Sequence, residues 1–165
     1  MRATTGAAEH AEPPRSPAER KDDLREQWRT ETTAWVATSG STGPHLVPLL
    51  FTYDGAAFTF ATFASSVTVA NIARTARVRI AIGHPYDVAM IDGTMRIIEP
   101  GAVDPETAAR YAALLRGGPD PRQTPGFVYL ELTPLRVQAW RSFAELGERT
   151  LMRGARWPLV GLSQR

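Results

Sequence analysis

The sequence contains no cysteine and a single lysine, Lys21, among its 165 residues. Without cysteine the chain forms no disulfide bond, has no thiolate nucleophile and holds no metal or iron–sulfur cluster through sulfur. No apolar run approaches the roughly 18 residues that cross a membrane, and the N-terminal region lacks the apolar core of a secretory signal. We therefore expect a cytoplasmic protein that does not associate with a membrane.

Motifs of enzymes that work without a cofactor are also missing. The segment Gly-Ser-Thr-Gly at 40–43 precedes a predicted strand rather than a helix and lacks a lysine, so it is no phosphate-binding loop. There is no Gly-x-Ser-x-Gly elbow, the three histidines lie far apart in the sequence, and no paired carboxylates are expected to face inward. We predict no metal site and assign no catalytic residue, so redox chemistry would come from a bound cofactor.

Arginine supplies all but one of the 19 basic residues, although the formal net charge is only +2. High-GC coding, which also favours Ala, Gly and Pro, is the explanation that we prefer, and anion recognition by the planar guanidinium is the alternative. Arg77 and Arg79 are expected on a solvated strand face, with a dimer contact or a ligand clamp as alternatives. The small net charge does not call for a nucleic-acid partner.

The chain is long enough for one domain with its own core. Residues 1–18 are rich in Ala, Pro, Glu and Arg and predict a disordered tail. Residues 19–145 form the predicted β-barrel domain, and 146–165 a basic C-terminal tail that packs on or near the barrel. Helices are predicted at 18–30 and 65–75, with a third opening at 104–105. Strands are predicted at 33–38, 45–53, 57–63, 77–82, 87–98 (with a bulge or a close backbone approach at Gly93) and 127–140.

The strand predicted at 45–53 is apolar in both of its alternating sets. One set is Val47, Leu49 and Phe51, and the other is Leu46, Pro48 and Leu50. A strand that is apolar on both sides is buried on both, as in a barrel wall covered by a partner or a cofactor. About six antiparallel strands close most readily into a small barrel.

An ordered set of short motifs spans residues 34–98. It runs through Ala-Trp-Val-Ala-Thr at 34–38, Gly-Pro-His-Leu-Val-Pro at 43–48, Asp-Gly at 54–55, Phe-Thr-Phe-Ala-Thr at 58–62, the serine-led helix at 65–75, Ala-Arg-Val at 76–78 and Ile-Asp-Gly-Thr at 91–94. This pattern resembles the pyridoxamine 5′-phosphate oxidase-like family of FMN- and deazaflavin-binding split β-barrels. The resemblance implies a mainly β split barrel with two or three short helices, which forms a homodimer with each cofactor site built from both subunits.

The resemblance also implies three groups of cofactor-binding positions. They are Val47, Pro48 and Leu49 against the ring; Ala61, Thr62, Ser65, Ser66, Thr68 and Asn71 toward the phosphate; and Trp140 and Arg149 near the C-terminus. A serine-capped helix start offers free N–H groups and a positive dipole end to an anion. The alternative for the two serines is plain helix capping without a ligand.

The sequence departs from the family in two places. A basic pair usual in the family is replaced by Val67 and Thr68, so the cofactor is bound differently, more weakly or not at all, with Arg74, Arg77 or a C-terminal arginine as possible substitutes. The Arg-x-His-Asp-Arg substrate motif of the vitamin-B6 oxidases is replaced by Glu-Leu-Gly-Glu-Arg at 145–149. We therefore do not expect oxidation of pyridoxamine phosphate itself.

Two hypotheses for the function follow. The first is a flavin- or deazaflavin-dependent oxidoreductase that transfers a hydride to or from a small organic substrate. The alternative is a non-catalytic split barrel that binds or stores a flavin or haem. For the cofactor, FMN or the deazaflavin coenzyme F420, the arginine-rich composition favours the deazaflavin, because it suggests a high-GC source in which relatives use that cofactor. Nucleic-acid binding by the arginine-rich tail ranks third and would be strongly salt-dependent.

Overall fold

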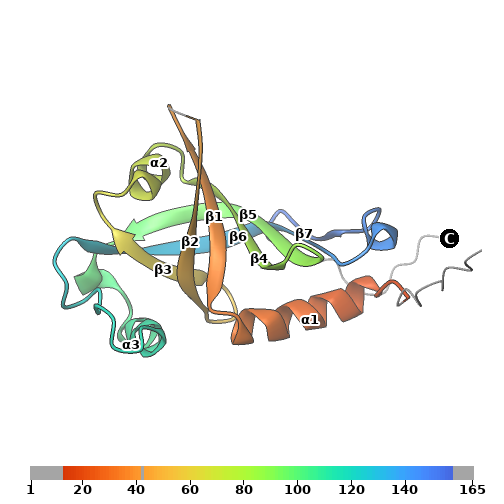
Figure 1. Cartoon of the computed structure of the whole chain (residues 1–165), viewed down its shortest axis with the longest axis horizontal. Helices are drawn as coiled ribbons and strands as arrows, with labels where there is room; N and C mark the ends of the chain where they lie inside the picture. The colour runs from red at the N-terminus through yellow and green to blue at the C-terminus, as the bar shows by residue number, and fades with distance from the viewer. Residues whose placement is uncertain (1–12, 42, 158–165) are drawn as a thin grey trace, which may run out of the picture.

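The computed structural model describes residues 13–41 and 43–157, which form a closed six-stranded antiparallel barrel with one additional strand and three α-helices (Figure 1). None of the helices in these ranges is long and apolar enough to span a membrane. The strands are β1 (Thr33–Gly40), β2 (Gly43–Tyr53), β3 (Phe58–Phe63), β4 (Arg77–His84), β5 (Asp87–Ile98), β6 (Phe127–Trp140) and β7 (Thr150–Arg153). The helices are α1 (Pro17–Thr30), α2 (Val67–Thr75) and α3 (Pro105–Leu114), with 3-10 turns at Pro100–Ala102 and Phe143–Glu145.

The strand order is β3-β2-β1-β4-β5-β6-β7, and a further pairing of β3 with β6 closes the ring. The first half of β6 pairs with β3, and its second half pairs with β7 outside the ring. The predicted bounds of β5 and β6 are those of the structure. The sequence did not predict β7, whose four residues are too few to show an alternating pattern.

The core inside the barrel is rich in aromatic rings. Phe51, Phe58 and Phe60 are at most 1% exposed, and Phe51 and Phe58 meet edge to face at 5.5 Å. Trp28 of α1 reaches the same cluster, with its ring 5.0 Å from that of Phe58. Leu24, one turn before Trp28 on the same face of α1, is buried in the same core.

Helix α1 begins at Pro17, one residue before the predicted start. The backbone N–H of Glu19 donates to Ser16 Oγ (3.2 Å), and the N–H of Ser16 donates to the carboxylate of Glu19 (2.7 Å). This reciprocal capping leaves Pro17 at the first helical position, where its missing N–H would have had no partner within the helix. Residues 1–12 of the predicted tail lie outside the described ranges.

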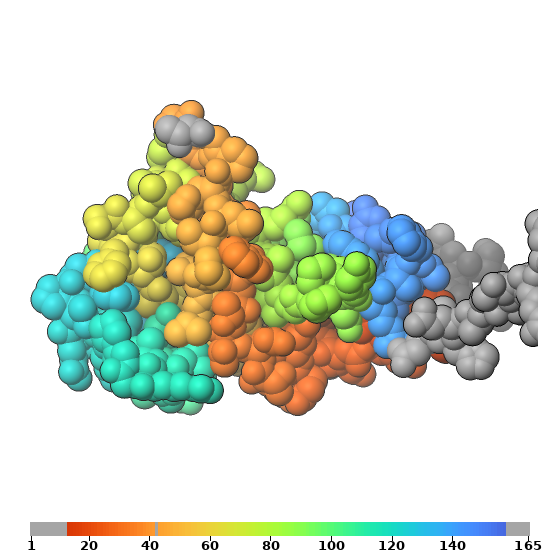
Figure 2. Space-filling model, viewed as in Figure 1, coloured from red at the N-terminus to blue at the C-terminus, as the bar shows by residue number. Residues whose placement is uncertain are grey.

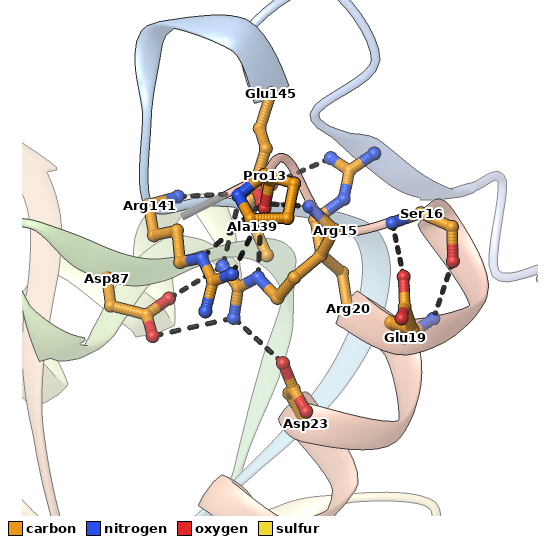
Figure 3. A network of polar contacts seen from close by, with 10 residues as sticks. All are labelled: Pro13, Arg15, Ser16, Glu19, Arg20, Asp23, Asp87, Ala139, Arg141 and Glu145. Atoms are coloured by element: carbon orange, nitrogen blue, oxygen red, sulfur yellow. Dashed lines mark hydrogen bonds and ion pairs between the residues drawn. The ribbon is translucent and has the colours of Figure 1, made fainter. Parts of the chain in front are cut away.

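Arg15 connects the start of α1 to two other parts of the molecule (Figure 3). Its guanidinium pairs with Asp23 (2.9 Å), with Asp87 at the start of β5 (2.9 Å) and with Glu145 after β6 (3.1 Å). Burial alone would raise the pKa of Glu145, but hydrogen bonds from Arg15 and from the N–H of Arg141 outweigh it and lower that pKa to about 2. The Glu145 side chain is therefore ionised although it is fully buried.

The barrel is split between β2 and β3. Their ladder has only three residue pairs, from Tyr53–Phe58 to Phe51–Phe60. Before Phe51, β2 pairs with β1 alone. Tyr111 of α3 occupies the divergence: its hydroxyl accepts from the N–H of Ala61 (3.1 Å) and donates to the carbonyl of Leu50 (3.4 Å). Leu50 and Ala61 would form the next pair of the ladder, so a side chain replaces the backbone contact there.

The close backbone approach predicted as one alternative at Gly93 is confirmed, and the bulge lies opposite it, in β6. Asp92 pairs with Arg136 and Gly93 with Pro134, so Leu135 of β6 is the extra residue. A Cβ atom on Gly93 would lie 2.4 Å from the carbonyl oxygen of Thr133, so the backbones approach too closely for any side chain. Glycine and proline thus occur together where the ladder is irregular.

Candidate functional site

Part of the barrel side of β2, β1, β4 and β5 that faces away from the core is an apolar patch. Trp35 lies opposite Pro48 on one side and Ala81 on the other, and Leu46 lies opposite Ala37. The side chains of Trp35 and Leu46 are 50% and 57% exposed. We call this surface, made up of Trp35, Ala37, Leu46, Pro48, Ala81 and Met90, the outer face. An apolar patch of this kind on one chain is typical of a ligand or partner surface.

The β1–β2 hairpin that bears part of the outer face projects beyond the body of the molecule (Figure 2). Of the three predicted ring-lining positions, Pro48 lies on the outer face and is exposed. Val47 and Leu49 are half-buried and lie on the other side of the strand, with Leu49 against the core. Consecutive residues of a strand point to opposite sides, so the three cannot share one surface.

Two of the predicted phosphate-binding residues have structural contacts of their own. Ser66 Oγ accepts the N–H of Val69 (3.3 Å) and so caps α2. Asn71 is buried and donates from Nδ2 to Thr38 Oγ1 (3.1 Å), which fastens α2 to β1. A Cβ atom on Gly40 would lie 2.2 Å from Asn71 Oδ1, so the strand passes close to this amide.

The other phosphate-end candidates surround the same β3–α2 connection with different accessibility. Ala61 is buried under α3 and its N–H is bound by the Tyr111 hydroxyl. Thr68 is also buried, Thr62 is half-buried and Ser65 is exposed. The only basic residue of α2 lies in its last turn, so no cationic side chain of the helix stands at its N-terminus.

Trp140 lies at the end of β6, and Arg149 directly precedes β7. Trp140, the last residue of β6, lines a pocket of about 230 Å³ with Tyr86 and Phe143, which are 81% and 93% exposed. Arg149 is exposed and donates from Nη1 to the carbonyl of Leu146 (2.9 Å). Trp140 lies on β6 and Pro48 on β2, strands that are not neighbours in the ring, and the pocket lined by Trp140 includes none of the ring-lining candidates. Within one chain the structure therefore does not bring these two predicted contacts together.

A groove with charged side chains adjoins the outer face. The sequence did not predict that its residues lie together. The groove has a volume of about 520 Å³, and we call it the arginine groove. Arg79 forms a two-pronged ion pair with Asp92 (Nη2–Oδ2 3.0 Å), and Arg136 Nη1 approaches the same carboxylate to 3.6 Å. The hydrogen bonds to Asp92 raise the pKa of Arg79. Residues around the groove include Ala37, Ser39, Arg77, Arg79, Asp92, Gly93 and Leu135.

The sequence alone identified Arg77 and Arg79 as strand residues but not their setting. Asp92 reaches Arg79 through the β4–β5 register, and Arg136 reaches Asp92 through the β5–β6 register. The alternation of residues 77–82 was the only available indication that the two arginines share a side. In the described ranges, no group of three or more His, Asp or Glu residues is arranged to hold a metal ion.

Comparison with protein-family models and with solved structures shows which known proteins this fold resembles. A family model for pyridoxamine 5′-phosphate oxidase matches residues 21–141, roughly three quarters of the chain. A proposed pyridoxamine 5′-phosphate oxidase from Listeria innocua superposes with a TM-score of 0.62 at 16% identity, over 74% of this chain and 98% of that chain. An F420 reductase gives 0.54 at 20% identity over 68% and 94%, and HupZ from Group A Streptococcus gives 0.57 at 20% over 72% and 94%.

At these identities the structural likeness establishes a shared fold and nothing finer. No curated protein matches the sequence significantly. The family model, by contrast, spans well over half of the chain and covers all six strands of the ring. The protein therefore belongs to the pyridoxamine 5′-phosphate oxidase family.

Proposed function

We propose that this protein is a flavin- or deazaflavin-dependent oxidoreductase that transfers a hydride to or from a small organic substrate, with its cofactor on the outer face of a homodimer. The observation behind the proposal is the exposed apolar surface around Trp35, Leu46 and Pro48. Covering such side chains stabilises an assembly by about 1.5–3 kcal/mol for each one fully buried. Family membership supports a flavin-type cofactor, and the likeness to an F420 reductase favours the deazaflavin.

The spacing of the predicted contacts supports a site shared by two copies. Pro48 and Trp140 both lie on the outer side of the barrel, on strands β2 and β6, which are not neighbours in the ring. Trp140 lines a separate pocket that includes none of the ring-lining candidates, so a single chain does not offer both contacts to one ring system. Two outer faces packed together would allow Pro48 of one copy and Trp140 of the other to contact the same ring.

When bound, the cofactor would supply the hydride chemistry. The outer face would orient the ring and exclude water from one side of it, because Trp35 and Pro48 offer flat or rigid apolar surfaces. Asp92 does not serve as a base here, since Arg79 and Arg136 both pair with its carboxylate. Glu145 stands where the vitamin-B6 oxidases carry their substrate motif and is engaged by Arg15, which supports a substrate other than pyridoxamine phosphate.

The alternative is a split barrel that binds or stores a flavin or haem without turnover. Two observations favour it. Helix α2 has no basic residue at its N-terminus, and Asp92, a carboxylate beside the outer face, is paired with Arg79 and Arg136. The two functions differ in a single measurable property, because only the oxidoreductase reoxidises its reduced cofactor with an organic acceptor.

The test combines cofactor binding with oligomeric state. The full chain is titrated with FMN and with F420 by fluorescence, and its mass is measured by light scattering. We expect micromolar binding of one cofactor and a dimer; replacing the exposed ring in Trp35→Asp should weaken binding at least about tenfold and favour the monomer.

Trp35→Phe is the matched control, because it keeps an aromatic ring on the outer face and should retain most of the affinity. Failure of both cofactors to bind the wild-type protein would exclude the proposed function. Binding without turnover across a panel of acceptors would favour the storage protein.

A further inference from the structure

The arginine groove is a hollow because the residues beneath it are small. Along β1 the outer positions pass from Trp35 to Ala37 and Ser39, and Gly93 supplies backbone without a side chain. Leu135, 40% exposed, stands at its edge. The volume of about 520 Å³ accommodates a small anion together with the chain to which it is attached.

The charges around this hollow do not balance. Arg77 and Arg79 line the groove together with one carboxylate, that of Asp92. Arg136, outside the lining, also approaches Asp92, so these four groups carry an excess of two positive charges. The guanidinium of Arg77 makes no hydrogen bond or ion pair with any residue in the described ranges. Within the same ranges Nε of Arg136 is buried without a hydrogen-bond partner. The cluster therefore retains unused donors as well as unused charge.

The donors that remain are already oriented. Asp92 holds Arg79 through Nε and Nη2, so the Nη1 group of Arg79 is free to bind another acceptor. Exposed ion pairs contribute little to stability, so the cluster is not explained as a stabilising device. A planar guanidinium fork matches the oxygens of a phosphate group, and such charge-assisted contacts are among the stronger hydrogen bonds.

We propose that the arginine groove binds a phosphate group, with Arg77 and Arg79 as its principal contacts. Arg77 follows the cap residue Ala76 of α2 directly, so the groove lies at the C-terminal end of that helix and is separate from its serine-capped N-terminus. The phosphate belongs either to the cofactor or to a phosphorylated substrate. The first assignment rests on the proposed function, whereas the anion site itself does not.

The site is tested first with pyrophosphate, which needs no flavin. The full chain and three variants are titrated by isothermal calorimetry, and phosphorus NMR provides a second readout. Arg77→Ala should weaken pyrophosphate binding about tenfold or more, and Arg79→Lys several-fold, because lysine keeps the charge but loses the fork. Arg29→Ala is the control: it removes the same charge from an exposed position in the last turn of α1, outside the groove, and should change affinity less than about twofold.

The source of the phosphate is tested by comparing FMN with riboflavin, which lacks the phosphate. If Arg77→Ala weakens FMN alone, the groove holds the phosphate of the cofactor; if it abolishes pyrophosphate binding but changes neither flavin, the groove serves the substrate. Absence of pyrophosphate binding to the wild-type protein, or equal loss in Arg77→Ala and Arg29→Ala, would overturn the proposal. Failure of FMN, riboflavin and F420 to bind would overturn the proposed function instead, while the pyrophosphate result would still decide the groove.

Discussion

The Tyr111 hydroxyl shows how much one polar atom contributes at the scale of a residue. It bonds to the Ala61 N–H and to the Leu50 carbonyl where β2 and β3 diverge, and burial raises the pKa of Tyr111 to about 12. The phenol is therefore neutral and able to donate at any physiological pH. Both bonds lie beneath α3, where an unpaired backbone group is costly.

Tyr111→Phe keeps the ring and removes both bonds. We expect a loss of about 1–3 kcal/mol in the free energy of unfolding, because the Ala61 N–H loses its partner in a buried setting. Urea denaturation measures this loss. Tyr53→Phe is the control, since that hydroxyl bonds only to the Gly55 carbonyl in an exposed turn and should matter less. Equal losses in the two variants would contradict the assigned role of Tyr111.

At the scale of an element, Gly93 of β5 lies opposite the bulge of β6, where the two backbones leave no room for a side chain. Gly93→Ala would place a Cβ atom 2.4 Å from the Thr133 carbonyl oxygen and 2.7 Å from Leu132 Cδ1. Because the first of these is backbone, β5 and β6 must separate, and we expect a loss of about 2 kcal/mol or more. Gly101→Ala, which meets no atom within 4 Å, should change the free energy of unfolding by less than about 0.5 kcal/mol. Thermal unfolding measures both variants. Similar melting temperatures would show that the strand pair tolerates a side chain at position 93 and would contradict this prediction.

Helices and strands could be predicted where the signal lies within the segment itself. This holds for the alternation of β5 and β6, for the capping serine of α2 and for the glycine opposite the bulge. The start of α1 was missed by one residue because the proline at 17 was taken as a helix breaker rather than as the first helical residue. The role of Tyr111 was not predictable, since its partners lie 50 and 61 residues away in the chain.

The candidate site, too, could be predicted only where its residues are close together in the sequence. Position-by-position resemblance indicated Pro48 and the β3–α2 connection, but it could not show that Asn71, Ser66 and the Ala61 N–H are already bonded. The arginine groove requires two strand registers at once, which only the folded sheet supplies. Whether the candidate positions contact a cofactor stays a prediction.

Across the whole molecule, Arg15 and Glu145 join segments that are 130 residues apart. The pKa of Glu145 falls from an ordinary 4.5 to about 2 in the folded protein. This ionised carboxylate therefore contributes about 3 kcal/mol to stability above pH 4.5, and the contribution is lost as the pH falls from there toward 2.

Glu145→Gln tests that contribution without changing the size of the side chain. At pH 7 it should lower the free energy of unfolding by about 2–4 kcal/mol, because Arg15 and Arg141 lose a buried partner. The gap between wild type and variant should narrow as the pH falls toward 2. Glu26→Gln on the exposed side of α1 is the control, and its unfolding curve should follow the wild type at every pH. A gap independent of pH would show that shape, rather than charge, is what matters at this position.

The double role of β6 has a consequence for how the protein is made. This one strand pairs with both β3 and β5, so a nascent chain that has not yet reached residue 127 leaves one edge of each exposed. Unpaired edges of this kind recruit other strands. During translation, therefore, the interval before β6 leaves the ribosome is when this barrel is most open to association with other nascent chains, and when a chaperone would protect it most.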